Sequence, residues 1–473
     1  MMMVRLVVLG LLALALAPPV YSADFVKVDG LRFTSGNCTD FKPVGWNGWS
    51  TLSYAANKKS MPGFNDGRAF LTNMFKEAQA LNFNVYRFFI QGDYSFLTTS
   101  AGQYDEQIFQ GFDFVLDEAA KYNIKLTPIL LNLWIDDGVP LFEKFCGSDS
   151  SNYRPTPSID LRTETTLNAS ERLQTPYKWY TDPDCRQYVK DFITKVVTRV
   201  NTINGIAYKD DPTIFSWNML NEPRCKYCGP EAVTEWYHDI AAHLKSVDLN
   251  HLVTTGEEGF FDESSSFVAA DPTDGNKWGP RSGQDFVANH DSPNIDYTVI
   301  HMWPDNWGVQ PNDIAFGKTW IDFHTQASTA LGKPLLMEEF GKGVTDSSQI
   351  TSVRDPWYSL TYDAATESIA AGGALRGALF WLWDGSTQNG GDGVVVGTAD
   401  STISNIVGLF ADEVKSSCRA SAPASTAAPG RAGASPAASR TGASPPASPS
   451  SIDLFQVQVP STVAAAGRKL LAH

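Results

Sequence analysis

The chain has 473 residues, of which 43% are hydrophobic and 19% charged, so it can bury a large core and is not a disordered protein. Its formal net charge of −15 argues against nucleic acid and anionic membranes as partners, because both bind basic surfaces. A neutral polymer is compatible with this charge. The 13 Trp residues either fill the core or line a carbohydrate-binding groove, and both readings stay open at this stage.

The first 22 residues have the pattern of a secretory signal peptide. Arg5 precedes an apolar run that ends near Ala17, and Val20-Tyr21-Ser22 puts small residues at the cleavage-site positions. The run is too short to span a bilayer comfortably. We therefore expect residues 1–22 to be removed and the mature chain to be secreted, extracellular or in the cell wall, with no membrane partner and as a monomer.

Eight β-rich apolar runs recur along the chain, with helix-like segments between them. The segment Gly67–Leu81 has apolar residues at helical spacing. Strands that alternate with helices indicate parallel βα units, and eight of them predict an α/β fold of the (β/α)8 TIM-barrel type with extended loops, over residues 23–416. The predicted strands are Lys42–Asn47, Asn84–Ile90, Lys125–Leu131, Thr213–Met219, His251–Thr255, Tyr297–His301, Pro334–Met337 and Ala374–Trp383.

The composition changes after residue 416. Residues 417–451 are dominated by Ala, Ser and Pro and contain neither aromatic nor acidic residues, so this segment cannot bury enough apolar surface to fold. We predict a disordered linker here, followed by a short C-terminal tail over residues 452–473.

Six cysteines occur, an even number that suggests disulfides in an exported chain. Cys225 and Cys228 have a spacing that also suits a metal, but no second such pair completes a zinc site, so a local disulfide is favoured. The other four, Cys38, Cys146, Cys185 and Cys418, allow three pairings, which the sequence leaves open. Sequons at Asn37 and Asn168 permit N-glycosylation.

Two carboxylates follow predicted strands at matching points. Glu222 follows the fourth strand in Asn-Glu-Pro, and Glu339 follows the seventh in Glu-Glu-Phe-Gly. In such a barrel the carboxyl ends of the strands form the active face, so the two groups should face each other across its mouth. Glycoside hydrolysis needs a pair of this kind. A helix cap or an ion pair with a nearby Arg is the purely structural alternative.

Three more strand-end residues fit the same face. Arg87 could orient a carboxylate through charge-assisted bonds, or belong to a structural ion pair. His301 could bond a carboxylate or a sugar hydroxyl, although a single His is more often structural. Either Trp381 or Trp383 should form the floor under the reacting sugar, and the other should belong to the core.

Four stretches resemble the plant-type mannan endo-1,4-β-mannosidases of glycoside hydrolase family 5. They are GQYDEQIFQGFDFVLDEAAKYNIKL, VVTRVNTINGIAYKDDPTIFSWNMLNEPRC, GQDFVANHDSPNIDYTVIH and KPLLMEEFGK, and the likeness covers roughly residues 25–412. The resemblance implies a retaining endo-β-1,4-mannanase that needs no cofactor and no metal. Its motifs imply Glu222 as the acid/base and Glu339 as the nucleophile. They also imply Asn221 at the sugar 2-hydroxyl, with Arg87, His301 and Trp381 in support.

The sequence departs from this family at two aromatic positions. Where the family has His-x-Tyr, with the Tyr hydroxyl on the nucleophile, the chain has His301-Met302-Trp303. Trp303 should either replace that bond with its indole N–H or serve as a stacking surface. Near the first strand, Trp49 is expected to take over a stacking role.

Further acidic and aromatic residues belong to the expected site. Glu258 fits a family Gly-x-Glu-Gly-Phe pattern and Trp134 is also predicted to bind substrate, while Glu257 is an additional acid without an assigned role. Glu338 is disfavoured as the nucleophile, because neighbouring residues of a strand point to opposite sides and its side chain should face away from the site.

Other functions stay possible from sequence alone. A cellulase-like β-1,4-glycanase or a mannan transglycosylase of the same family would use the same residues, since a sugar can intercept the covalent intermediate in place of water. A non-enzymatic wall-binding protein is disfavoured, because both carboxylates and Arg87 are present.

Overall fold

A computed structural model describes residues 24–36, 38–92, 95–133, 139–146, 177–225, 229–272, 279–309, 313–383 and 393–420. All of them belong to one compact unit. The predicted linker from residue 421 onward, the tail, the signal segment, the sequon residues Asn37 and Asn168, and Trp134 lie outside these ranges.

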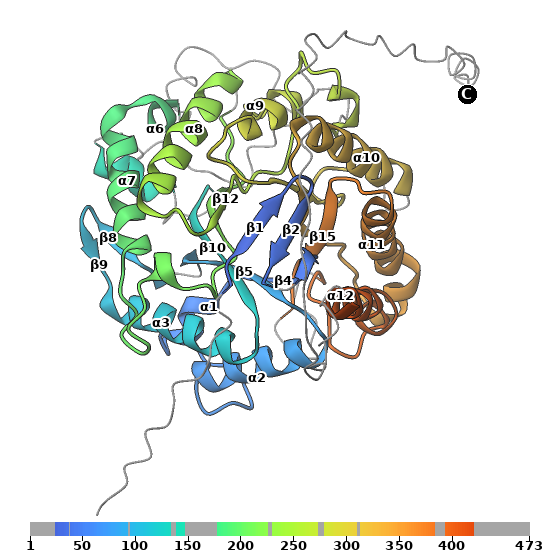
Figure 1. The fold of residues 1–473 in the computed structure, drawn as a ribbon, viewed down its shortest axis with the longest axis horizontal. Coiled ribbons are helices and arrows are strands. Elements are labelled where there is room, and N and C mark those ends of the chain that lie inside the picture. The colour runs from blue at the N-terminus through green and yellow to red at the C-terminus, as the bar shows by residue number, and fades with distance from the viewer. Residues whose placement is uncertain are drawn as a thin grey trace, which may run out of the picture. The chain divides into compact units, whose positions relative to one another are not determined.

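Eight parallel strands form one sheet that curves into a barrel (Figure 1). Their order around the sheet is β12-β11-β10-β5-β4-β15-β14-β13, and the seam between β12 and β13 is bridged by two backbone hydrogen bonds, from Asp296 N to Val253 O (2.9 Å) and from His301 N to Glu258 O (3.0 Å). All eight predicted strands and the (β/α)8 class are confirmed. The strands are β4 (Val44–Gly48), β5 (Val85–Phe89), β10 (Lys125–Asn132), β11 (Ser216–Asn221), β12 (Leu252–Thr254), β13 (Thr298–Met302), β14 (Leu335–Phe340) and β15 (Leu375–Phe380).

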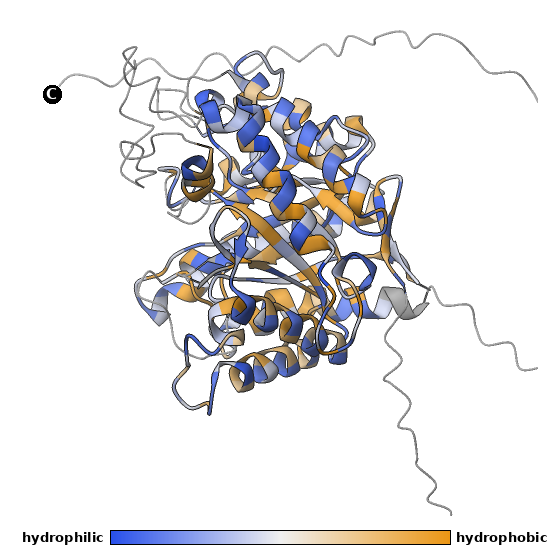
Figure 2. Ribbon diagram, turned by 90° about the vertical axis from the view of Figure 1, so that its left-hand side faces the viewer, coloured by the Kyte–Doolittle hydropathy of each residue, from blue (hydrophilic) through white to orange (hydrophobic). Residues whose placement is uncertain are grey.

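Helices surround the barrel (Figure 1). The predicted helix at Gly67–Leu81 is α2 (Gly67–Ala80); Asp66 caps its N-terminus by accepting from Ala69 N (2.8 Å), and Phe70 and Met74 lie on its buried face. In Figure 2 the central strands are largely hydrophobic, whereas the helices carry both hydrophilic and hydrophobic residues. The other α-helices are α1 (Thr51–Ala55), α3 (Glu106–Lys121), α4 (Val139–Phe145), α6 (Tyr177–Thr181), α7 (Pro183–Val197), α8 (Pro230–Val247), α9 (Phe286–His290), α10 (Ile314–Leu331), α11 (Asp355–Ala370) and α12 (Gly408–Ala420).

Shorter elements fill the connections. Helix α12 continues four residues past the expected end of the globular domain at residue 416. No helix within the described ranges is long and apolar enough to cross a membrane. The short elements are β6 (Gln91–Gly92), β7 (Ser95–Phe96), β8 (Thr98–Ser100), β9 (Gln103–Tyr104), 3-10 turns η2 (Tyr208–Asp210), η3 (Val268–Ala270), η4 (Gly279–Arg281) and η5 (Ser347–Gln349), and π-turns η6 (Ile350–Arg354) and η7 (Ile403–Val407).

A small antiparallel sheet, which the sequence analysis did not anticipate, packs on one end of the barrel. It consists of β1 (Val26–Asp29), β2 (Arg32–Ser35) and β3 (Cys38–Phe41). Phe33 packs edge-on against Phe215 and Tyr297, near the beginnings of β11 and β13, with ring centroids 5.4 and 5.3 Å away. This sheet therefore covers the amino-terminal end of the barrel, opposite to the end at which the strands finish.

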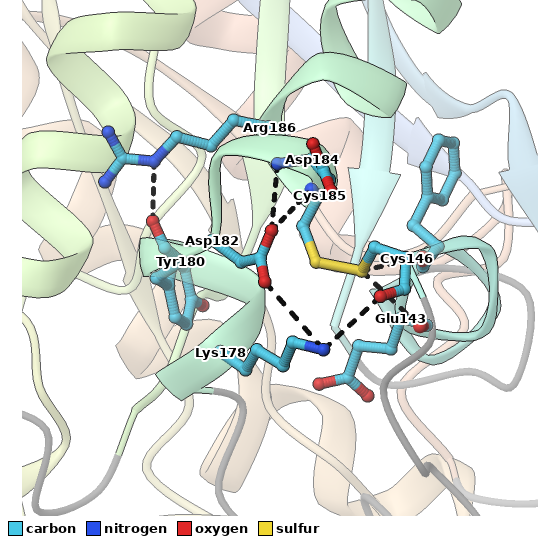
Figure 3. The surroundings of a disulfide bond; sticks show 9 residues. Glu143, Cys146, Lys178, Tyr180, Asp182, Asp184, Cys185 and Arg186 are labelled. Atoms are coloured by element: carbon cyan, nitrogen blue, oxygen red, sulfur yellow. Dashed lines mark hydrogen bonds and ion pairs between the residues drawn. A yellow bond between two sulfur atoms is a disulfide. The ribbon is translucent and has the colours of Figure 1, made fainter.

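One disulfide joins Cys146, just after α4, to Cys185 in α7, with Cα atoms 5.1 Å apart (Figure 3). This bond belongs to one of the three pairings that the sequence left open. Lys178 strengthens the same junction, since its Nζ donates to Cys146 O (3.3 Å) and lies 3.8 Å from Asp182. Cys38 and Cys225 are also disulfide-bonded, but the Cys225–Cys228 pairing involves a residue outside the described ranges and stays a prediction.

Candidate active site

Polar side chains gather where the barrel strands end. Strands β4, β5, β11, β13 and β14 are buried along their whole length, yet each carries a polar or charged residue near its carboxyl end. Such a residue costs free energy unless it is hydrogen-bonded, and parallel strands bring these residues to one edge of the barrel. The residues are Asn47, Arg87, Asn221, His301, Glu338 and Glu339.

Glu339 is held by two charge-assisted hydrogen bonds. Arg87 Nη1 donates to its Oε2 (2.7 Å) and Trp303 Nε1 donates to its Oε1 (2.9 Å). Trp303 thus replaces the expected Tyr hydroxyl as a donor, which is the first of the two roles foreseen for it. Burial raises the pKa of the Glu339 carboxyl, while the positive charges of His301 and Arg87 oppose that rise.

Glu222 follows β11 in a left-handed backbone conformation. Its φ is +51°, which is uncommon for a residue with a side chain and is found disproportionately at functional sites. The Glu222 amide donates to Gly256 O (2.8 Å), which holds the turn in place. The side chain is 12% exposed, against 7% for Glu339, so of the two carboxyl groups Glu222 is the more accessible from outside.

The two carboxylates lie close together. One side-chain oxygen of Glu222, one of Glu339 and one ring nitrogen of His301 lie within 4.8 Å of one another. His301 Nδ1 is 2.8 Å from Glu222 Oε1. Of the two bonds considered for His301, the structure therefore shows the bond to a carboxylate.

His301 carries a positive charge at neutral pH. Burial by itself lowers its pKa, but the charge of Glu339 and the hydrogen bond to Glu222 outweigh burial and raise the pKa to about 10. Its Nδ1–H can then donate to Glu222. The side-chain atoms of the three groups lie close enough together for proton transfer among them.

Arg87 connects the strand ends. Its Nη1 also donates to Asn47 Oδ1 (2.9 Å) and its Nη2 to Asn221 Oδ1 (2.6 Å). The amide of Asn221 donates in turn to Asn132 Oδ1 (3.1 Å), which fixes the orientation of Asn221 beside Glu222. The planar guanidinium thus sets the relative positions of β4, β5, β11 and β14 at the site.

The expectation that Glu338 points away from the site is wrong. Its side chain is fully buried inside the barrel, where Oε1 accepts from Asn218 Nδ2 (2.7 Å) and lies 3.4 Å from Arg87 Nε. The register explains this result: Ile300 pairs with Met337 but His301 pairs with Glu339, so β14 contains one extra residue. Such a bulge breaks the alternation of side chains, and both adjacent glutamates face inward.

Glu257 and Glu258 follow β12, and their side chains lie in different surroundings. Glu258 accepts from Arg224 Nε (2.7 Å) and from Gln284, and burial raises its pKa. Glu257 contacts Asn289 and lies 3.3 Å from His290, and burial raises its pKa well above the ordinary value. Glu258 therefore belongs to a cluster with Arg224 beside Glu222, whereas Glu257 lies in a separate cluster with Asn289 and His290.

The aromatic candidates separate into site and core. Trp381 is half-buried and lies edge-on to Trp303 at 6.2 Å, whereas Trp383 is fully buried against Trp46 at 5.3 Å. Trp381 is thus the more accessible of the two rings. Trp49 is half-buried and packs edge-on against Phe89 at 4.8 Å, without a direct contact to either carboxylate.

Several polar residues of the site were missed by the sequence analysis. Asn132 and Asn218 orient Asn221 and Glu338, while Arg224 and Gln284 bind Glu258. The two asparagines carried a usable signal, since Asn132 ends the apolar run of β10 and Asn218 lies between Trp217 and Met219 in β11. Arg224 and Gln284 lie in loops and carried no such signal.

Comparison with known proteins agrees with this geometry. A family model described as GH family 5 beta-mannosidase-like matches residues 23–393. Mannan endo-1,4-beta-mannosidase 1 of Arabidopsis thaliana is 34% identical over 74% of this chain and 80% of its own length. Mannan endo-1,4-beta-mannosidase 1 of Oryza sativa subsp. japonica is 34% identical over 76% of this chain and 78% of its own length.

A solved structure shares the fold. The endo-1,4-beta-mannanase from Rhizomucor miehei superposes with a TM-score of 0.64 at 24% identity, covering 83% of this chain and 99% of that one. At this identity the likeness supports the barrel alone. The extent of the family match, together with the two plant relatives, shows that the chain belongs to the β-mannosidase-like group of glycoside hydrolase family 5.

Proposed function

We propose that this protein is a secreted, retaining endo-β-1,4-mannanase, with Glu339 as the nucleophile and Glu222 as the acid/base. The observation that carries the proposal is the pair of carboxylates, which have oxygens within 4.8 Å of each other. Retaining glycosidases place these groups about 5–5.5 Å apart, whereas inverting enzymes leave about 6.5–9.5 Å for a water molecule. The short separation supports direct attack by one carboxylate.

In the first step, a Glu339 oxygen attacks the anomeric carbon while the bond to the leaving-group oxygen breaks. The leaving oxygen takes the proton of Glu222, and a covalent mannosyl-Glu339 ester forms. Arg87 and Trp303 donate to Glu339 and favour its ionised form, which is the nucleophilic form. Glu222 Oε1 already accepts from His301, so the transferred proton is assigned to Oε2.

In the second step, Glu222 is a carboxylate and removes a proton from water. The water oxygen attacks the anomeric carbon, the ester bond breaks, and Glu339 leaves as a carboxylate. Positively charged His301 stabilises the anionic Glu222 that this step requires. Two displacements at the same carbon restore its original configuration.

The substrate assignment rests on the relatives, two of which are named mannan endo-1,4-beta-mannosidases. The surroundings of the carboxylates are compatible with a neutral sugar. Trp381 offers a half-buried ring beside Trp303, and Asn221 lies next to Arg87 where a 2-hydroxyl would approach. The apolar run ahead of residue 22 supports secretion.

The test is a substrate panel combined with product stereochemistry. Mannan, glucomannan, galactomannan and carboxymethyl cellulose are each incubated with the enzyme, with Glu339→Gln as the inactive control. The proposal expects internal cleavage of the mannans, and a β-anomer as the first product in proton NMR. Comparable activity on carboxymethyl cellulose with none on mannan would contradict the substrate, and an α-anomer would contradict retention. Dominant transfer to added mannooligosaccharides would identify a transglycosylase.

A further inference from the structure

Glu338 is a buried charge that the reaction does not consume. Its carboxylate is wholly inside the barrel, and no part of the mechanism above uses it. Three strands supply its neighbours: Arg87 from β5 at 3.4 Å, Asn218 from β11 at 2.7 Å and His301 Nε2 from β13 at 3.6 Å. A buried carboxylate in such company is retained only if cationic and hydrogen-bonding partners compensate its lost hydration.

The imidazole of His301 lies between two carboxyl groups. Its Nδ1 faces Glu222 at 2.8 Å and its Nε2 faces Glu338 at 3.6 Å. The contact at Nδ1 is a hydrogen bond, whereas that at Nε2 is an ion-pair distance longer than a hydrogen bond. An imidazole between two carboxylates is favoured as the doubly protonated cation, because both negative charges stabilise it. The charge of the group at Nε2 therefore adds to those of Glu339 and Glu222 in favouring the cationic form of His301.

We propose that Glu338 is a positioning residue, whose carboxylate keeps His301 protonated and oriented so that it donates to Glu222. This inference rests on the proposed function, because it assigns to Glu338 an influence on the acid/base. The bulge in β14 makes the arrangement possible, since it turns two consecutive carboxylates inward. Glu339 then reaches the sugar, while Glu338 supplies the counter-charge to His301 and Arg87.

Other titratable groups also surround His301 and Glu338. Arg87 is the other cation among them, and it already binds Glu339 and Asn221. The neighbouring groups are Arg87 from β5, Glu222 after β11, Tyr237 from α8, Glu257 and Glu258 after β12, Tyr297 ahead of β13 and Glu339 from β14. Of the carboxylates in this set, Glu338 alone lies within 4.0 Å of the Nε2 side of the ring.

Glu338→Gln tests the charge at constant shape. Asn218 Nδ2 holds the oxygen of the new amide on its own side, so the amide N–H would face His301 Nε2. An N–H opposite Nε2 favours the neutral ring, in which Nε2 is an acceptor. A nearby charge changes a pKa by about 1–3 units, so the midpoint of His301 should fall by about one pH unit or more.

The direct readout is 15N NMR of the histidine rings in the whole protein, with Glu338→Gln compared to wild type. The chain has seven histidines, and the ring signals of His301 are identified as those that disappear from the spectrum of His301→Gln. Burial lowers the pKa of His290 to about 3 and that of His324 to about 4, so these two buried rings stay neutral in mildly alkaline buffer. We expect wild-type His301 to be cationic in that buffer and to lose its proton at lower pH in the variant.

Glu257→Gln is the matched control. Glu257 is also a fully buried glutamate beside the site, but burial raises its pKa well above the ordinary value and so favours its uncharged form, and its side chain lies against His290 rather than His301. The titration midpoint of His301 should move to lower pH in Glu338→Gln, stay in place in Glu257→Gln and be restored in Glu338→Asp, which keeps the charge.

Two results would overturn the proposal. One is an unchanged His301 titration in folded Glu338→Gln; the other is a neutral His301 in the wild type near neutral pH, which needs no variant at all. The NMR measurement requires no substrate, so it tests Glu338 even if the enzyme cleaves a different glycan.

Discussion

Removal of the indole N–H of Trp303 should impair catalysis more than it impairs folding. In Trp303→Phe, the 2.9 Å hydrogen bond to Glu339 Oε1 is lost, while the hydrogen bond from Arg87 to the same carboxylate is kept. A hydrogen bond to a charged group contributes about 1.5–3 kcal/mol. Since about 1.4 kcal/mol is a tenfold change in rate, kcat/KM should fall by about 10- to 150-fold.

The assay is the initial rate on a soluble mannan or an aryl mannoside, with Trp383→Phe as the matched control. Trp383 is also buried and donates through Nε1, but to Thr398 Oγ1 at 3.1 Å and outside the site. The control should lower the melting temperature and leave kcat/KM near wild type. A Trp303→Phe enzyme with a rate within about twofold of wild type would refute the role of this donor.

Gly341→Ala offers a second route to the same hydrogen bond. A Cβ on Gly341 would lie 2.9 Å from Cη2 and Cζ3 of Trp303, closer than van der Waals contact allows. The ring must therefore shift while its N–H is retained, so this variant should lose activity in the same direction as Trp303→Phe. Normal activity in Gly341→Ala would show that the position of the ring is not critical.

Three further predictions concern stability and the chain end. Asp113 is buried outside the site and accepts hydrogen bonds from Arg199 Nε (2.9 Å) and Tyr208 (2.6 Å). Asp113→Asn should therefore lower the free energy of unfolding in urea by about 3–5 kcal/mol, while the folded enzyme keeps its kcat; a change below about 1 kcal/mol would contradict this. The pKa of His301 in the folded protein, about 10, exceeds its unfolded value, so the contribution of its charge to the free energy of unfolding is full below about pH 6.5 and is lost as the pH rises through about 10. When the free energy of unfolding is measured across this pH range, His301→Gln should lack this loss. Truncation after Ala420, which keeps α12 whole, should preserve the melting temperature and specific activity, and loss of folding would show that the tail packs on the barrel.

Much of the barrel was predictable because its strands are buried on both faces. Near-continuous apolar runs such as those of β10 and β15 signal such strands, and the polar residue that ends each run marks the active face. Glu222, Glu339, Arg87 and His301 were found in this way, and the structure brings them together. The family resemblance added their proposed roles.

The remaining features depend on register and on contacts across the barrel, which a sequence read one strand at a time does not contain. The inward position of Glu338 follows from one extra residue in β14, and strict alternation predicted the opposite. Likewise, the choice between a hydrogen bond and a stacking role for Trp303 depends on where the loop after β13 places its ring. The small sheet of β1, β2 and β3 also escaped prediction, because its strands are short and only partly buried.

The central claim is that Glu339 is the nucleophile and Glu222 the acid/base, and azide rescue tests it most directly. With Glu339→Ala and an activated aryl mannoside, azide should attack in place of the missing nucleophile and give an α-mannosyl azide, the inverted product. With Glu222→Ala, the covalent intermediate still forms, so azide should replace water in the second step and give a β-mannosyl azide with retained configuration. The opposite stereochemistry in each variant would show that the two roles are exchanged, and full activity of Glu339→Ala without azide would contradict the assignment altogether.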